Sequence, residues 1–444
     1  MTTLKQLARE IFHSTLAAID IRATLERKLA RAGSRITVGD ETVDLAGFSR
    51  IVAIAFGKAA FAMAEGLQQV LAPDFSPHGI LVTPTPPPRE LPGFRTFVGG
   101  HPVPTAASVA AAEAILELLR GCDARTVIFF LLSGGGSALV EKPLYEEISL
   151  ADLQALNQLL VTCGAPIDEI NAVRKHLSAV KGGRLAAAAP QALKLTLGIS
   201  DVPVGRESAL ASGPTLPDPT TVEDAYRVVH DYALLEKLPA SLRQRFAQRQ
   251  LAETPKPGDA AFARARFALL LGLDDLFHPA HRAAEARGFI THCDNSTDDW
   301  PLETAATALL ERLDEMQRQH PGKRVALIAD GEITCKVTGN GRGGRNSALV
   351  LYCVEKIAGR PVAVLSAGTD GVDGNSPAAG AVADGNTLDA ARKAGLDPQD
   401  FFRRSDAYSF FHQLGDAIET GPTGNNLRDL RILLAAPELE PGQP

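Results

Sequence analysis

Cysteine is scarce in this chain of 444 residues, which contains five: Cys122, Cys163, Cys293, Cys335 and Cys353. Their number is odd, they are widely spaced and no C-x-x-C pair occurs, so neither a disulfide framework nor a zinc site is indicated. This usage of cysteine is typical of a reducing compartment, and we expect the protein to be cytoplasmic.

An excess of positive charge and a long apolar run are also lacking. The formal net charge is −7, whereas proteins that bind nucleic acids or anionic membranes usually present a basic face. No uncharged run is long enough to cross a bilayer as a helix. Residues 1–29 have an amphipathic helix pattern with charges throughout, unlike a signal peptide. We therefore expect a small-molecule partner, neither nucleic acid nor membrane, and a monomer or a homodimer.

The sequence does contain short apolar segments that alternate with longer helical patterns, which is the order expected of an α/β protein with largely parallel sheets. The segments predicted to be strands are 50–57, 79–84, 126–134, 193–201, 324–332, 333–344 and 361–371. A polar, proline-containing stretch at 249–261 is interpreted as part of a linker. The predicted organisation is an N-terminal α/β domain over 1–248, a linker with connecting helices over 249–322, and a C-terminal α/β domain over 323–444, with a cleft between the two domains.

Three consecutive glycines follow one of the predicted strands, between Ser133 and Ser137. They are Gly134, Gly135 and Gly136. Ligands of open α/β sheets bind at the carboxyl ends of strands, and successive backbone N–H groups near a helix N-terminus suit a phosphate or a carboxylate. The run therefore predicts an anion-binding loop, with a tight turn that binds no ligand as the alternative.

Two single residues end other predicted strands. Lys58, in FGKAA, opens a helix pattern at a strand end, where an ammonium group can neutralise a transferring phosphoryl group. A solvated helix lysine is the alternative. Asp201, in GISDVPVG, precedes a proline-ordered loop and is placed like a general base or a metal ligand. For Asp201 the alternative is an Asx-turn.

A second glycine-rich segment, GNGRGGRN at 339–346, carries Arg342 and Arg345. Guanidinium groups bind a carboxylate or a phosphate in a bidentate manner, so the segment predicts a second anion site, with an exposed β-turn as the alternative.

The same segment matches the dinucleotide pattern G-x-G-x-x-G through Gly339, Gly341 and Gly344. That pattern belongs to a first strand-turn-helix unit with an acidic residue about 20 positions further on. Here the nearest acidic residue at a strand end, Asp370, lies too far along the chain, so the match is weak.

The segment GTDGVDGNS places Asp370 and Asp373 in a glycine loop after a predicted strand. It lacks the full spacing and the terminal glutamate of an EF-hand. A Mg²⁺ site and a hydrogen-bonded turn both remain open for these two residues.

Eight segments of the sequence match one known family in order, from about residue 50 to residue 434. They are FGKAA, GGHPVP, LLSGGGSAL, INAVRKHLSAVKGGRLA, SDVP followed by ASGPT, GNGRGGRN, GTDGVDG with AAGA, and TGPTGNNLRDLRILL. Together they resemble the class of glycerate 2-kinases whose C-terminal part is called the MOFRL domain. Because the segments cover nearly the whole chain, a chance resemblance is not credible.

The resemblance implies two Rossmann-like α/β/α domains with an active site in the cleft between them. It implies ATP-dependent phosphorylation of D-glycerate to 2-phosphoglycerate, with Mg²⁺ bridging the nucleotide phosphates. In this mechanism Asp201 accepts the proton of the C2 hydroxyl group, and Lys58 stabilises the transferring phosphoryl group together with Arg342 or Arg345. The residues predicted to bind substrate or phosphate are Ser133, Gly134, Gly135, Gly136, Ser137, Asn171, Arg174, Lys175, Gly341, Gly343, Gly344 and Asn346.

Two other functions stay open at this point. An NAD(P)H-dependent hydroxypyruvate reductase would use the same glycines for a pyrophosphate, and relatives in tartrate-utilisation operons carry that label. A non-catalytic sensor of a sugar acid or a nucleotide would bind its ligand without turnover.

Overall fold

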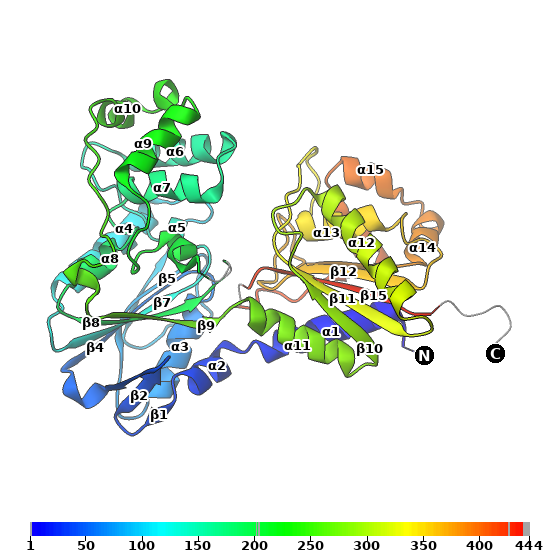
Figure 1. Ribbon diagram of the computed structural model, residues 1–444, viewed down its shortest axis with the longest axis horizontal. Coiled ribbons are helices and arrows are strands. Elements are labelled where there is room, and N and C mark those ends of the chain that lie inside the picture. The colour runs from blue at the N-terminus through cyan, green and yellow to red at the C-terminus, as the bar shows by residue number, and fades with distance from the viewer. Residues whose placement is uncertain (1, 201, 203–204, 425–426, 438–444) are drawn as a thin grey trace. The chain divides into compact units, whose positions relative to one another are not determined.

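The structure is a computed structural model that describes residues 2–200, 202, 205–424 and 427–437. The chain forms two compact units (Figure 1). One unit is residues 21–271, and the other is discontinuous, joining residues 1–20 to residues 272–444. The α/β class predicted from the sequence is confirmed.

The limits of these units differ from the boundaries predicted at residues 248 and 323. The polar stretch at 249–261 is mostly a loop, and the rest of the predicted linker with its connecting helices contributes two helices and one strand to each six-stranded sheet. It contains β9 (Ala265–Leu271), α11 (Leu273–Glu285), β10 (Phe289–Asp294) and α12 (Leu302–Gln319).

The unit of residues 21–271 is built on a six-stranded sheet in the order β6-β5-β4-β7-β8-β9, in which every neighbouring pair is parallel. Its other strands are β4 (Arg50–Phe56), β5 (His78–Thr83), β6 (Phe94–Val98), β7 (Thr126–Leu132) and β8 (Leu193–Ile199). Counted along the chain, this is the order 3-2-1-4-5-6 of dinucleotide-binding folds. All seven side chains of β7 are buried, as expected for a parallel strand covered on both faces.

Helices cover this sheet and form a further group beside it. They are α2 (Ile21–Lys28), α3 (Ala60–Leu71), α4 (Ala106–Arg120), α5 (Gly136–Leu139), α6 (Leu150–Thr162), α7 (Ile167–Leu177), α8 (Arg184–Ala187), α9 (Val222–Asp231) and α10 (Ala240–Ala247). Figure 1 shows α6, α7, α9 and α10 gathered together, and they share an apolar core of their own. A small antiparallel sheet precedes β4 and consists of β1 (Arg31–Ala32), β2 (Arg35–Val38) and β3 (Glu41–Asp44).

The second unit has a six-stranded sheet in the order β10-β11-β15-β12-β13-β14. Its remaining strands are β11 (Arg324–Asp330), β12 (Val362–Gly368), β13 (Gly380–Asp384), β14 (Ala417–Ile418) and β15 (Asp429–Ala435). Only β10 and β11 pair in parallel, because β15 inserts antiparallel between β11 and β12, and β13 and β14 continue the antiparallel pairing. The prediction of a mostly parallel sheet therefore holds for residues 21–271 and is wrong for this sheet.

The prediction of a strand over 333–344 is also wrong. This segment is a loop in which only Thr334 makes an isolated bridge, to Pro301. Its glycines instead allow close packing on other loops, since a Cβ added at Gly339 would stand 2.4 Å from the carbonyl oxygen of Arg404.

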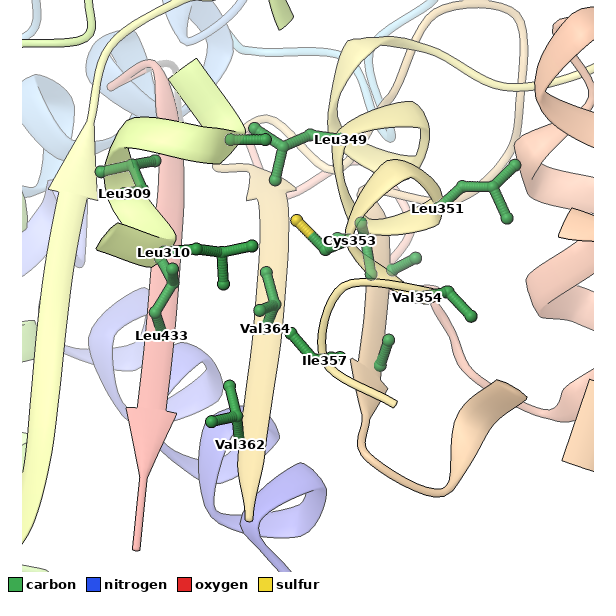
Figure 2. Packing of buried hydrophobic residues seen from close by; sticks show 14 of the residues in the cluster. Leu309, Leu310, Leu349, Leu351, Cys353, Val354, Ile357, Val362, Val364 and Leu433 are labelled. Carbon is green, nitrogen blue, oxygen red and sulfur yellow. The ribbon is translucent and has the colours of Figure 1, made fainter. Parts of the chain in front are cut away.

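Helices cover both faces of this second sheet (Figure 1). They are α1 (Leu4–Ala18), α11, α12, α13 (Arg345–Cys353), α14 (Thr387–Lys393), α15 (Pro398–Arg403) and α16 (Ala407–Leu414). Figure 2 shows the core on one face, where Leu309 and Leu310 of α12 and Leu349 and Cys353 of α13 pack near Leu433 of the sheet. The opposite face is covered by α1 and α11.

The N-terminal helix α1 thus belongs to the unit formed mainly by the C-terminal half of the chain. Ile11 and Phe12 are fully buried there, and Lys5 Nζ lies 2.7 Å from Asp416 Oδ2. Within the described residues, the helices are all too short or too polar to cross a membrane.

Candidate active site

The chain order of the parallel sheet reverses between β4 and β7. From β4 the chain continues to β5 and β6 on one side, and from β7 it continues to β8 and β9 on the other. Ligands of open α/β sheets bind outside the carboxyl ends of the strands at such a point. Lys58 follows β4 and the glycine run follows β7, so the fold places both predicted features at this position.

Hydrogen bonds join the loops that follow β4 and β7. The backbone N–H of Lys58 donates to the carbonyl oxygen of Gly134 over 3.0 Å, and the N–H of Ala59 donates to Ser133 Oγ, also over 3.0 Å. Gly57 has a φ of +128°, and a Cβ there would stand 2.1 Å from Ser133 Oγ. Gly57 therefore allows the two loops to meet.

The glycine run has two roles in its own packing. Gly135 has a φ of +84° and starts the short helix α5, and a Cβ at this position would lie 3.0 Å from His101 Cδ2 and 3.5 Å from Lys58 Cγ. A Cβ at Gly136 would lie 2.8 Å from the Cβ of Ala211. The sequence predicted that a ligand comes close to these glycines. In the structure, side chains of the protein come close to them.

His101 is a residue of this site that the sequence analysis did not select. It follows β6, whose carboxyl end lies at the same edge of the sheet, and its ring stands against Gly135. The available signal was the segment GGHPVP, which was recognised as a family motif without a role for its histidine.

A chain of side-chain hydrogen bonds brings Ser137 and Asn171 together. Ser212 Oγ donates to Asn171 Oδ1 over 3.3 Å, and the hydroxyl groups of Ser137 and Ser212 are 2.9 Å apart. Because the proton of Ser212 is directed to Asn171, Ser137 is the donor to Ser212. The amino-terminal half of α7 is thereby linked to the glycine loop.

The other two predicted ligands on α7 contact protein groups. Lys175 is buried and its Nζ lies 3.0 Å from Asp218 Oδ1. Burial alone opposes ionisation of Asp218, but the Lys175 ammonium outweighs it and lowers the pKa of that carboxyl group. Arg174 donates from Nε to Asn157 Oδ1 over 2.7 Å. Asp201, the predicted base, lies outside the described residues.

In the second unit, most backbone N–H groups of the segment 339–346 donate to protein acceptors. The N–H acceptors are the carbonyl oxygen of Arg404 for Gly341, Asp406 Oδ1 for Arg342, Asn375 Oδ1 for Gly343 and Ser347 Oγ for Gly344. These groups do not form a free cradle for an anion, and the match to a dinucleotide pattern finds no support here.

Asp373 occupies the N-terminus of α13. Its carboxylate accepts hydrogen bonds from the N–H groups of Asn346 (3.0 Å) and Ser347 (2.8 Å) and from Ser347 Oγ (2.6 Å). Burial raises the pKa of Asp373 above its ordinary value, even though these hydrogen bonds act in the opposite direction. The position that the sequence suggested for a phosphate is therefore taken by a side chain of the protein itself.

The second predicted metal ligand, Asp370, accepts the N–H of Val372 through Oδ1 over 3.0 Å, which is an Asx-turn. In the part of the chain that the structure describes, no three histidine, cysteine or acidic side chains are grouped so that they could hold a metal ion.

The two arginines of this segment have different surroundings. Arg345 donates from Nε to Asp429 Oδ2 over 2.6 Å, and its Nη2 lies 2.8 Å from Glu332 Oε1. These two carboxylates outweigh the effect of burial and raise the pKa of Arg345. Arg342 is exposed and stacks over the ring of Tyr408, with 4.8 Å between Cζ and the ring centroid.

Comparisons with known proteins agree with the fold. The profile of a domain of unknown function, DUF4147, matches residues 7–247, and the profile of the MOFRL family matches residues 325–429. The D-glycerate 2-kinase of Thermotoga maritima is 35% identical over 396 residues, which are 88% of this chain and 92% of that protein.

Two further comparisons extend over almost the whole chain. A protein of Agrobacterium vitis with the provisional name hydroxypyruvate reductase is 34% identical and covers 97% of this chain, which in turn covers 94% of that protein. The crystal structure of the glycerate kinase of Thermotoga maritima matches with a TM-score of 0.82 and 34% identity, over 98% of this chain and 99% of that one. The resemblance seen in the motifs is confirmed, and the chain belongs to the family of glycerate 2-kinases in which a DUF4147 domain precedes a MOFRL domain.

Proposed function

We propose that this protein phosphorylates D-glycerate at the C2 hydroxyl group with ATP as phosphoryl donor, giving 2-phosphoglycerate and ADP. The observation that carries the proposal is the meeting of Lys58 and the glycine loop at the point where the parallel sheet reverses its strand order. A relative named D-glycerate 2-kinase, 35% identical over most of both chains, supports the same reaction.

Phosphoryl transfer requires positioning and charge neutralisation more than covalent chemistry. In the proposed reaction, the C2 oxygen forms a bond to the γ-phosphorus while the bond from that phosphorus to the departing ADP oxygen breaks. The hydroxyl proton passes to Asp201, which ends as a carboxylic acid. Lys58 and Arg345 stabilise the charge on the transferring group, and Arg342 is the candidate for the carboxylate of glycerate.

The glycine loop fits the role of holding phosphate oxygens. Gly135 is in a conformation that glycine adopts without strain, and it lies beside the His101 ring and the stem of Lys58. Ser133 and Ser137 contribute hydroxyl groups to the loop, although both make the hydrogen bonds described above. These residues would hold the phosphates of the nucleotide and exclude water from them.

The described residues do not fit a Mg²⁺ site built by the protein alone. Both carboxylate oxygens of Asp373 are engaged by α13, and Asp370 forms a turn. Mg²⁺ is commonly bound by substrate phosphates with one or two carboxylates. We therefore propose that any Mg²⁺ enters with the nucleotide, and we assign no step to it.

The reductase alternative is favoured by the name of the Agrobacterium vitis relative. The structure supplies less for it, because the turn after β4, the first strand of the parallel sheet, reads Gly57-Lys58-Ala59-Ala60 and lacks the three glycines of a dinucleotide turn. The segment that has those glycines follows β11 in the other unit, where its N–H groups bind protein acceptors.

A coupled assay of ADP release with D-glycerate, ATP and Mg²⁺ tests the proposal, and phosphorus NMR of the product distinguishes the C2 from the C3 position. We expect 2-phosphoglycerate and a loss of roughly 10²–10³-fold in kcat for Lys58→Ala, as for a lost electrostatic donor. Asp201→Asn should lower kcat by roughly 10²–10⁴-fold with little change in KM.

Lys237→Ala, which removes an exposed lysine of the same unit, is the matched control and should leave turnover unchanged. Consumption of NADH with hydroxypyruvate, without ADP release from glycerate and ATP, would replace the kinase by the reductase. Binding of either ligand without turnover would indicate a sensor.

A further inference from the structure

The first residue of β15, Asp429, lies at the edge of the sheet where β11 and β12 end. Because β15 runs antiparallel between these two strands, Asp429 stands opposite Gly368 and its neighbour Leu430 stands opposite Asp330. The strand is central in its sheet: Asp429 pairs with β12, and the next residue, Leu430, pairs with both β11 and β12. The position of the Asp429 carboxylate is therefore well fixed, and it can orient a side chain that binds to it.

The partner is Arg345, the first residue of α13. The carboxylate of Asp429 accepts from Nε over 2.6 Å and from Nη2 over 3.3 Å, a forked contact that fixes the plane of the guanidinium group. Only 4% of the Asp429 side chain is exposed, whereas 34% of Arg345 is exposed. Among the described residues, Arg345 donates hydrogen bonds from Nε and Nη2 and none from Nη1.

Asp429 also forms an ion pair with Arg431, which is fully buried. Arg431 donates to the carbonyl oxygens of Asp330 and Gly331, each over 2.8 Å, and its Nη2 lies 3.9 Å from Asp429 Oδ2.

Glu332, the second acidic neighbour of Arg345, is a weaker support. Its Oε1 lies 2.8 Å from Nη2, but 42% of its side chain is exposed. Exposed ion pairs of this kind contribute little to fixing a side chain. The forked contact from the buried carboxylate therefore determines the orientation of Arg345.

We propose that Asp429 is a positioning residue for phosphoryl transfer, which holds the Arg345 guanidinium so that Nη1 is directed to the transferring group. The inference rests on the proposed function, because it requires Arg345 to act on the phosphoryl group. A buried carboxylate that orients a cation has the same task as the Lys–Glu pair of protein kinases, and a fixed cation stabilises a transition state without reorganisation.

Asp429→Asn keeps the shape of the side chain but replaces one acceptor oxygen by an NH₂ group, which breaks the fork. We expect kcat to fall by about 10- to 100-fold, the range usual for outer-shell partners of active-site groups, while the KM for glycerate changes little. Asp429→Glu keeps the negative charge on a side chain that is one methylene longer, and its kcat should lie between those of the wild type and Asp429→Asn. The matched control is Asp416→Asn, a buried, ion-paired aspartate of the same unit that contacts Lys5 and lies outside the proposed site, and its kcat should be that of the wild type.

Chemical rescue separates positioning from stability. Guanidinium ion added to Arg345→Ala should restore part of the activity, since Asp429 would orient the small cation, and it should restore none in Arg345→Ala/Asp429→Asn. Equal rescue of both variants would overturn the positioning role of Asp429. Full activity of Arg345→Ala would instead overturn the role of Arg345 in the proposed function. If Asp429→Asn fails to fold, a wild-type kcat for Asp429→Glu would likewise overturn the inference.

Discussion

Gly135 has a backbone conformation that favours glycine and also lies within the candidate site. An alanine at φ +84° costs about 1–2 kcal/mol in any protein, and here its Cβ would also press on His101. We expect Gly135→Ala to lower kcat/KM at least about tenfold, a loss of roughly 1.4 kcal/mol in transition-state binding. Enzyme kinetics and circular dichroism on the same samples measure both effects.

Gly164→Ala is the control for that substitution. Gly164 has a φ of +87° but open space where the Cβ would be, so the same backbone cost arises without the contact. It should lower the melting temperature about as much as Gly135→Ala and leave activity intact. Activity in both variants would show that the ligand site tolerates a side chain at position 135.

Asp330 is a buried carboxyl group without a compensating hydrogen bond, since neither side-chain oxygen has a partner in the described part of the chain. Burial raises the pKa of Asp330 to about 6 from its ordinary value of 3.8. Between these pH values the folded protein keeps a proton that the unfolded chain releases, so stability should fall as the pH rises from about 4 to about 6.

Asp330→Asn removes this titration. The variant should be more stable than the wild type at pH 7, and the difference should shrink as the pH approaches 4. Urea unfolding at pH 4, 5, 6 and 7 measures the difference. A constant difference across these values would mean that Asp330 is ionised throughout.

The sequence predicted correctly that Lys58 and the glycine run follow strand ends, because a strand, its end and the next helix are all local features. Contacts between residues distant along the chain were not predicted. Asp429 is 84 residues from Arg345 and Asp373 is 26 from Ser347, and no spacing rule connects such pairs. The sequence therefore suggested an anion site where the fold supplies its own carboxylate.

At the scale of elements, Glu253 connects the loop 249–261 to α7 through His176 and also pairs with Lys256 of the same loop. Glu253 Oε1 lies 2.9 Å from His176 Nε2 and 2.7 Å from Lys256 Nζ. Partial burial opposes ionisation of Glu253, but hydrogen bonds from Lys256 and His176 outweigh it and lower its pKa to about 2, from 4.5. The polar residues of this stretch, which the sequence analysis read as a linker, instead hold the loop in place.

The lowered pKa of Glu253 predicts the pH range in which this loop loses its contacts. The stabilising contribution of Glu253 is complete above pH 4.5 and is lost as the pH falls toward 2. The hydrogen-exchange protection of residues 249–261, measured relative to the intrinsic exchange rate at each pH, should therefore fall over that range in the wild type. In Glu253→Gln the protection should already be low at pH 6 and should change little on acidification.

Strands were predictable where they were long, apolar and bounded by glycine, as in β4 and β7. The position of β15 could not be derived in the same way, because the apolar run of 429–435 carries no information about its neighbours. Its insertion between β11 and β12 converts a sheet that looked parallel into a mixed one. Pairing is decided by the tertiary fold, and the local pattern does not reveal it.

At the scale of the whole molecule, the discontinuous unit depends on a helix from the far end of the chain. Phe12 of α1 is fully buried among residues of that unit, and Phe→Ala in a core typically costs about 3–5 kcal/mol. We expect Phe12→Ala to reduce hydrogen-exchange protection in β12, β13 and β15.

The matched control is Phe246→Ala, which opens the helical core of residues 21–271. It should reduce protection in α6, α7 and α9 and spare β12, β13 and β15. The reverse pattern, or an equal loss everywhere in both variants, would contradict the division of the chain into two units.

The central position of β15 has a consequence for synthesis on the ribosome. Helix α1 emerges first, yet its sheet lacks a middle strand until residues 429–435 have been made. At roughly 5–20 residues per second, α1 waits on the order of 20–80 s for that strand. During translation α1 therefore has no complete sheet to pack against, and a chain that ended before β15 would leave the facing edges of β11 and β12 unpaired.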